Sequence, residues 1–143
     1  MPSPLENRRS VAVLAVDDQA AFRHAVREVV EATEGFELVG EARSCEEALA
    51  LAREHEPDLV LVDVRMPGID GLETTRRLSA AHPGATCVLV STDDLTQQPC
   101  DACGAATFLL KKEFGRVALR RLWDEHGGSR SSPPDDAAPR IKS

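Results

Sequence analysis

The sequence predicts an α/β domain in which five parallel strands form one sheet with helices on both faces. Short runs of apolar residues alternate with longer stretches whose apolar residues recur every three or four positions. An apolar run without polar alternation is typical of a strand buried on both faces, and parallel strands need a helix to carry the chain back between them. Aromatic residues make up only 3% of the 143 residues, so the core should consist of Val, Leu and Ala.

The first half of the chain predicts two strands and two helices. Val11–Val16 is an uninterrupted apolar run and predicts the first strand. Residues 19–34 predict a helix, and 37–42 a short second strand. The second helix begins after Ser44, a good N-cap residue, and ends before Pro57. The residues expected to form the inner face of the first helix are Phe22, Ala25, Val26, Val29 and Val30.

The second half continues the alternation. Leu59–Val62 predicts the third strand, 72–81 a helix, 86–90 the fourth strand and 107–110 the fifth. Residues 93–104 carry a weak helical signal, because Leu95 is their only large apolar residue and Pro99 would interrupt a helix. A last helix is predicted over 114–123, with an inner face that consists of Val117, Ala118 and Leu122.

Polar residues follow four of the five apolar runs, and these residues are the candidate site. The candidates are Asp17 and Asp18 after the first strand, Asp63 after the third, Ser91 after the fourth and Lys111 after the fifth. The carboxyl ends of parallel strands share one edge of the sheet, so these side chains should lie close together. Each one alone would more often be a helix cap or a surface lysine, but capping explains neither the paired acids nor the lysine.

Three clustered carboxylates repel one another unless a cation lies among them. Mg²⁺ suits a site with one or two carboxylates and a phosphate, and no other cofactor is expected. Lys111 and the Ser91 hydroxyl could then contact phosphoryl oxygens.

Composition excludes several classes of function. The net charge of −7 and the pI near 5.1 argue against nucleic-acid binding, and the small basic cluster at Arg116, Arg120 and Arg121 fits a solvated helix face. No apolar run is long enough for a membrane span, and residues 1–10 lack the core of a signal peptide. We expect a cytoplasmic protein with reduced thiols, in which Cys45 and Cys87 are small apolar core residues.

With these residues in place, the chain resembles the receiver domain of two-component response regulators. The resemblance covers about Val11 to Trp123 and rests on the acid pair, on Asp63 followed by Met66-Pro67-Gly68 and Asp70-Gly71, and on Ser91 and Lys111. It implies a doubly wound, flavodoxin-like sheet with the strand order 2-1-3-4-5. The segments around Phe22-Arg23, Val39-Gly40-Glu41-Ala42 and Phe108 are similar to the subgroup whose members usually carry a C-terminal helix-turn-helix domain, which we do not expect in this chain.

The resemblance also implies a function and a role for each site residue. Asp63 would accept a phosphoryl group from a histidine kinase or a phosphotransfer protein, in a phosphoprotein that is not an enzyme beyond a slow self-dephosphorylation. Asp17, Asp18, Asp63 and the Arg65 backbone carbonyl would bind Mg²⁺. Ser91 and Phe108 would be the switch residues. The signal would pass to an unknown downstream protein by contact, or the phosphoryl group would pass on in a phosphorelay.

These expectations leave two alternatives. The first is a degenerate receiver that binds proteins without phosphorylation. The segment from Asp93 to Gly104, which is shorter than usual for the family and contains Pro99, weighs for this alternative, and the three intact acids with Ser91 and Lys111 weigh against it. The second alternative is a Mg²⁺-dependent phosphatase with an aspartyl nucleophile. Such an enzyme usually carries a second Asp two positions after its nucleophile, and the presence of Arg65 at that position weighs against this alternative.

Two further expectations concern the end of the chain and its cysteines. The expected organisation is a flexible N-terminus over 1–9, a receiver over 10–126 and a disordered tail over 127–143. Cys100 and Cys103 are interpreted as incidental thiols, because a single C-x-x-C without a second ligand pair is a weak metal signal.

Overall fold

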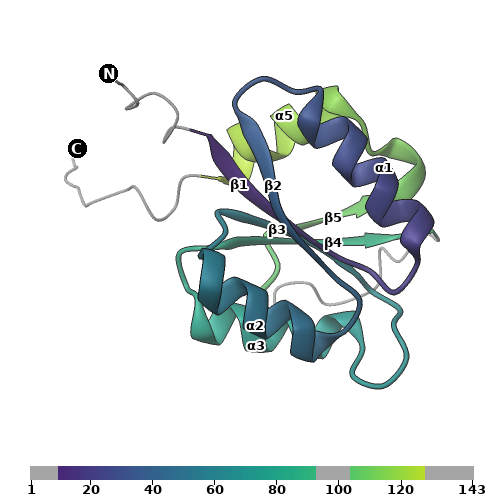
Figure 1. Cartoon of the computed structure of the whole chain (residues 1–143), viewed down its shortest axis with the longest axis vertical. Coiled ribbons are helices and arrows are strands. Elements are labelled where there is room, and N and C mark those ends of the chain that lie inside the picture. The colour runs from purple at the N-terminus through teal and green to yellow at the C-terminus, as the bar shows by residue number, and fades with distance from the viewer. Residues whose placement is uncertain (1–9, 93–103, 128–143) are drawn as a thin grey trace.

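The strands form one parallel sheet in a computed structural model of the chain, which describes residues 10–92 and 104–127 (Figure 1). Their order is β2-β1-β3-β4-β5, and every neighbouring pair is parallel. This confirms the predicted fold class and strand order. The strands are β1 (Val11–Val16), β2 (Phe36–Ala42), β3 (Leu59–Asp63), β4 (Thr86–Ser91) and β5 (Thr107–Leu110).

Helices cover both faces of the sheet. In Figure 1, α1 and α5 lie on one side of the strands and α2 and α3 lie on the other. The helices are α1 (Ala20–Glu31), α2 (Cys45–His55), α3 (Gly71–Ala81) and α5 (Arg116–His126), with a short 3₁₀ turn, η2 (Lys111–Glu113), after β5. The sheet therefore separates two apolar cores, one under each pair of helices.

The central strand β3 is buried along its whole length, as its apolar run predicts. Its side chains alternate between the two cores: Val60 and Val62 pack toward α2 and α3, and Leu59 and Leu61 toward α1 and α5. Cys45 and Cys87 are also buried, which confirms their interpretation as core residues.

Two N-caps show why the helices start where they do. The Ser44 hydroxyl accepts a hydrogen bond from the Glu47 N–H at 3.2 Å, as the sequence predicts. The Asp70 carboxylate caps α3 in the same way, at 3.0 Å from the Glu73 N–H. Asp70 thereby fixes the start of α3 directly after the loop that follows Asp63.

The predicted inner face of the last helix is wrong at one position. Val117 is 74% exposed, whereas Leu119 and Leu122 are buried. The helix begins at Arg116 rather than at Phe114 and continues to His126. Phe114 instead packs from the preceding turn against Phe22 of α1, with ring centroids 5.9 Å apart, so the helix starts two residues later than the pattern indicated.

Several predictions fall outside the described residues. They concern the flexible N-terminus over 1–9, the shortened segment with Pro99 and the Cys100 and Cys103 pair, and nearly all of the predicted tail. Within residues 10–92 and 104–127, no helix has the length and apolar character needed to cross a membrane.

Candidate functional site

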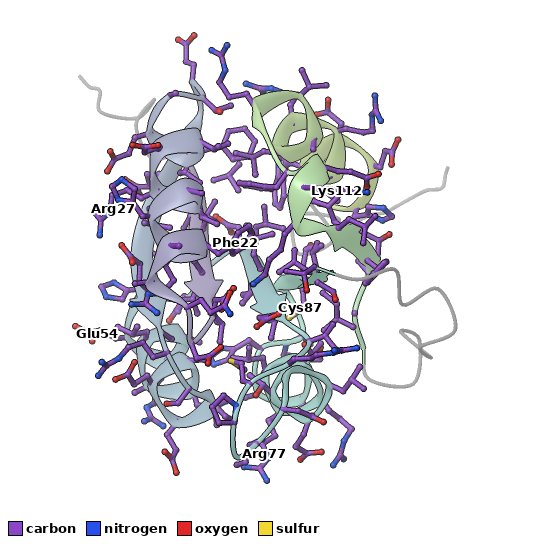
Figure 2. The ribbon with its side chains drawn as sticks, turned by 90° about the vertical axis from the view of Figure 1, so that its right-hand side faces the viewer. Phe22, Arg27, Glu54, Arg77, Cys87 and Lys112 are labelled. Atoms are coloured by element: carbon purple, nitrogen blue, oxygen red, sulfur yellow. The ribbon has the colours of Figure 1, made fainter. Side chains whose placement is uncertain are left out.

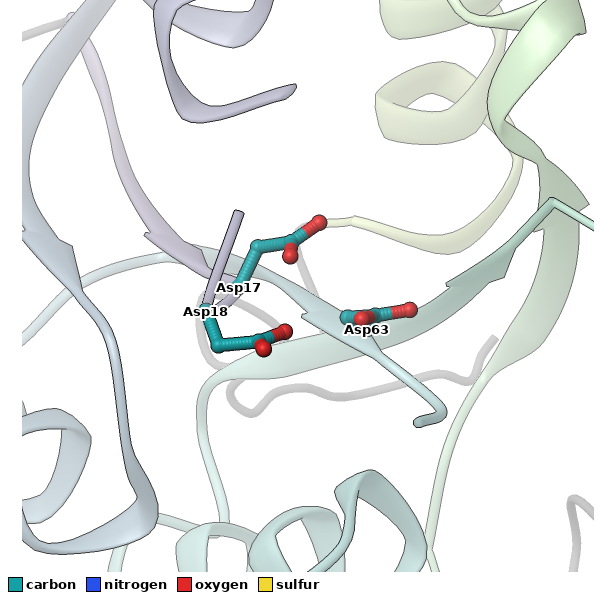
Figure 3. A group of neighbouring side chains, drawn as sticks. All are labelled: Asp17, Asp18 and Asp63. Atoms are coloured by element: carbon teal, nitrogen blue, oxygen red, sulfur yellow. The ribbon is translucent and has the colours of Figure 1, made fainter. Parts of the chain in front are cut away.

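Three carboxylates meet at the carboxyl edge of the sheet (Figure 3). Asp17 follows β1 directly and is fully buried, and Asp63 is the last residue of β3 and is 6% exposed. Asp18 is exposed to solvent. One oxygen from each carboxylate lies within 4.8 Å of the others, so the three acids that the sequence predicts to converge do converge.

Lys111 brings a positive charge to this cluster from the end of β5. Its Nζ lies 2.6 Å from Asp17 Oδ2 and 3.7 Å from Asp63 Oδ1, and its side chain is 10% exposed. The ammonium also lies over the Phe22 ring, 4.7 Å from its centroid, which is a favourable cation–π distance. Lys111 is therefore held against the carboxylates rather than extended into solvent.

The electrostatic environment of Asp63 favours its protonated form. Burial raises the pKa of this carboxyl from 3.8 to about 6, and the neighbouring Asp17 charge adds to the effect. The Lys111 charge and a hydrogen bond from the Arg65 backbone N–H oppose the shift without cancelling it. A further positive charge beside Asp63 would therefore stabilise its ionised, nucleophilic form.

The donor set fits a hard divalent cation. Asp17 Oδ2 is buried, and no described residue gives it a hydrogen bond of good geometry, although the Lys111 ammonium is close. The Lys111 charge offsets only one of the three converging carboxylates, so the cluster keeps a net negative charge that a second cation would neutralise. Mg²⁺ prefers oxygen ligands of this kind, and the open side at Asp18 leaves room for water or a phosphate.

The two predicted switch residues lie on neighbouring strands. Ser91 is the last residue of β4, is 1% exposed and pairs with Leu110 of β5. Phe108 pairs with Leu89, so the alternation of side chains places Phe108 and Ser91 on the same face of the sheet. Phe108 is half-buried against the core under α2 and α3. Arg65 is exposed two residues beyond Asp63, and the role of its carbonyl as a ligand stays a prediction.

The sequence interpretation missed the residues that support the acids. The Gln19 N–H donates to Asp17 Oδ1 at 2.8 Å, and its side-chain oxygen lies 3.5 Å from Lys111 Nζ. Arg23 donates to the Asp17 backbone carbonyl at 2.7 Å. Gly71 places the start of α3 directly against the Asp63 backbone. In the sequence, Arg23 and Gly71 stand out only as part of the family resemblance, and Gln19 only as the start of the predicted helix, and none of these signals specifies a contact.

Comparison with known proteins agrees with this geometry. Residues 13–122 match the family model described as the response regulator receiver domain. The chain is 41% identical over 103 residues to the response regulator GacA of Pseudomonas viridiflava, an alignment that covers 71% of this chain and 48% of that protein. This chain thus spans about half the length of that relative.

Solved structures are similar over most of their own length. The signal receiver domain of the response regulator NarL from Mycobacterium tuberculosis has a TM-score of 0.71 and 31% identity, covering 81% of this chain and 95% of that one. A chain in the CheX-CheY-BeF3-Mg+2 complex from Borrelia burgdorferi has a TM-score of 0.72 and 25% identity, with an alignment that covers 85% of this chain and 92% of that one.

Proposed function

Because this chain belongs to the response regulator receiver domain family of two-component systems, we propose that it accepts a phosphoryl group on Asp63. The observation that carries the proposal is the convergence of Asp17, Asp18 and Asp63 with the Lys111 ammonium 3.7 Å from Asp63 Oδ1. The donor is the phosphohistidine of a histidine kinase or of a phosphotransfer protein, and the protein acts in the cytoplasm.

In the proposed reaction, an Asp63 carboxylate oxygen attacks phosphorus while the bond from phosphorus to the donor histidine nitrogen breaks. The electron pair of that bond remains on the imidazole, which takes up a proton from solvent. Such a transfer depends mainly on positioning and on stabilising charge. Asp63 is suited to this role because it lies at the edge of a fixed central strand, and Lys111 is suited to contact a phosphoryl oxygen.

The metal ligands in this proposal are Asp17, Asp18, Asp63 and the Arg65 backbone carbonyl. Bound Mg²⁺ would neutralise the carboxylates and the phosphoryl oxygens. Asp17 contributes the buried carboxylate, whose Oδ1 accepts a hydrogen bond from the Gln19 N–H, and Asp18 contributes the exposed carboxylate.

Signal output in this proposal starts at Ser91 and Phe108. The Ser91 hydroxyl moves toward the phosphoryl group and Phe108 follows it inward, which alters the surface near β5. A downstream protein reads this surface by contact, or the phosphoryl group passes on in a phosphorelay. The chain is a phosphoacceptor and not a phosphatase, because the position two residues after Asp63 carries Arg65 in place of a second acid.

The direct test is the intact mass of the protein after incubation with Mg²⁺ and a small acyl-phosphate donor. We expect a gain of one phosphoryl group in the wild type and none in Asp63→Asn. A gain that persists in Asp63→Asn would place the acceptor elsewhere. No gain in folded protein that binds Mg²⁺ would contradict the proposal and favour a receiver that binds its partner without phosphorylation.

Replacing Lys111 with methionine should separate metal binding from phosphoryl transfer. Loss of the competing ammonium, 2.6 Å from Asp17 and 3.7 Å from Asp63, should tighten Mg²⁺ binding several-fold. Without the Lys111 ammonium to contact the phosphoryl oxygens, phosphorylation should be slower by about 100-fold. The measurements are a Mg²⁺ titration and the initial rate of phosphorylation at saturating Mg²⁺. Lys112→Met is the control, because Lys112 carries the same charge at the next position and is exposed.

A further inference from the structure

Arg23 of α1 connects the acid pair to the neighbouring strand β2. Its Nη1 donates a hydrogen bond to the Asp17 backbone carbonyl at 2.7 Å, and its Nε lies 3.3 Å from Glu41 Oε1. The Arg23 and Glu41 side chains are only 13% and 20% exposed. The ion pair is therefore partly desolvated, and it holds the guanidinium in one orientation.

The Asp17 carbonyl needs this donor because β1 ends there. The Asp17 N–H still donates to the Ala42 carbonyl of β2 at 2.9 Å, but the residue is fully buried and its own carbonyl lies beyond the paired part of the strand. A buried backbone carbonyl without a donor is costly, and Arg23 supplies that donor from α1.

This hydrogen bond also helps to position Asp18. The Asp17 carbonyl and the Asp18 N–H belong to one planar peptide group, so a donor that holds the carbonyl also holds the plane of the peptide and the position of the Asp18 Cα, from which the side chain extends. Within the parts of the chain that the structure describes, the Asp18 carboxylate has no hydrogen bond or ion pair of its own. Its position in Figure 3, turned toward Asp63, depends on the backbone.

We propose that Arg23, anchored by Glu41, is a positioning residue that sets the orientation of the peptide between Asp17 and Asp18 and thereby the affinity of the acidic site for Mg²⁺. The inference rests on the proposed function, in which these two acids bind the metal. It assigns a role to two residues, one on α1 and one on β2, that touch neither the metal nor the phosphoryl group.

Charge and geometry make opposite predictions for Arg23. Loss of a positive charge close to three carboxylates would, by charge alone, tighten the binding of a cation. Loss of the donor that orients the acid pair would weaken it, and removing an outer partner of a metal ligand costs about 10-fold or more in affinity. The sign of the change in Mg²⁺ affinity therefore distinguishes the two.

The experiment is a Mg²⁺ titration of isotope-labelled protein followed through amide chemical shifts, which also report whether each variant is folded. We expect Arg23→Met to bind Mg²⁺ about 10-fold more weakly than the wild type. Arg27→Met is the matched control: Arg27 carries the same charge and also pairs with Glu41, but its side chain is 49% exposed and reaches outward at the left edge of Figure 2. Its Mg²⁺ affinity should stay within about twofold of the wild type or rise slightly. Equal or tighter binding in Arg23→Met would overturn the inference.

Two further variants test the anchor and guard against misfolding. Arg23→Lys keeps the charge but loses the guanidinium fork, so a several-fold loss of affinity is expected even if Arg23→Met does not fold. Glu41→Gln should weaken Mg²⁺ binding in the wild type and cause no further loss in the Arg23→Lys background. A full additional loss there would show that Glu41 acts through its own charge and overturn its role as anchor.

Mg²⁺ binding and phosphorylation of the wild-type protein show whether the inference fails alone or together with the proposed function. A wild-type protein that is folded and binds no Mg²⁺ would overturn the proposed function together with the inference. A wild type that binds Mg²⁺ and is phosphorylated, beside an Arg23→Lys variant with unchanged affinity, would overturn the inference alone.

Discussion

Replacing Gly71 with alanine is expected to destabilise the protein by at least about 3 kcal/mol, because the backbone of Asp63 and Val64 occupies the space of the new methyl group. A Cβ at this position would lie 1.9 Å from the Asp63 carbonyl oxygen and 2.8 Å from Val64 Cα. The Gly71 N–H also donates to the Val64 carbonyl at 2.9 Å, so the start of α3 cannot move away without losing that bond. Neither obstacle is a side chain that could rotate aside.

The measurement is urea unfolding of the wild type and of Gly71→Ala in the presence of Mg²⁺. Gly115→Ala is the matched control, since no atom lies within 4 Å of a Cβ at position 115 and its backbone is extended. The control should cost less than about 1 kcal/mol, the usual effect at a helix N-cap. Similar losses in the two variants would contradict the role assigned to the close approach. Because the overlap is with Asp63, folded Gly71→Ala protein should also lose phosphorylation.

The fold was predictable because each strand is a short apolar run and each helix carries an apolar face. The element ends were less predictable where polar residues belong to a strand. Asp63 pairs with Val90 and Ser91 pairs with Leu110, so both are within the sheet, although the sequence interpretation placed them just after it. Val117 was assigned to the core because a periodic pattern gives the spacing of a helix face but not its phase when two phases fit.

The acidic site was predictable to the extent that it follows from topology. Parallel strands bring their carboxyl ends together, so Asp17, Asp18, Asp63 and Lys111 could be grouped before any geometry was known. The supporting contacts could not. Arg23 and Glu41 are 18 residues apart, and their contact depends on how α1 crosses the sheet, which no local pattern specifies.

In the absence of Mg²⁺ at pH 7.5, Asp63→Asn is expected to raise the free energy of unfolding by up to about 3 kcal/mol. Burial and the Asp17 charge raise the pKa of Asp63 to about 6, so the folded state binds this proton more tightly than the unfolded state does. The proton therefore contributes stability that is fully present below about pH 4 and is lost as pH rises through about 6. Asparagine keeps the neutral form at every pH and avoids that loss.

The check is urea unfolding of both proteins in a chelator from pH 4 to pH 8. The difference between Asp63→Asn and the wild type should be small near pH 4, grow until about pH 6.5 and then stay constant. Asp124→Asn, which removes an exposed acid on α5, should show no such rise. A difference that does not change with pH, or a wild type that is the more stable protein at pH 7.5, would contradict the expectation.

Mg²⁺ should reverse this order of stability. At pH 7.5 the ion stabilises only the protein that can bind it, so the wild type should gain stability with each increase in Mg²⁺ while Asp63→Asn gains little. Protons and Mg²⁺ compete for the same carboxylate, and the affinity of the wild type for Mg²⁺ should therefore fall as pH drops below about 6. The same closeness of the carboxylates thus explains both the instability of the ion-free site and its proposed function. Carboxylates close enough to bind one cation together repel one another until the cation is bound.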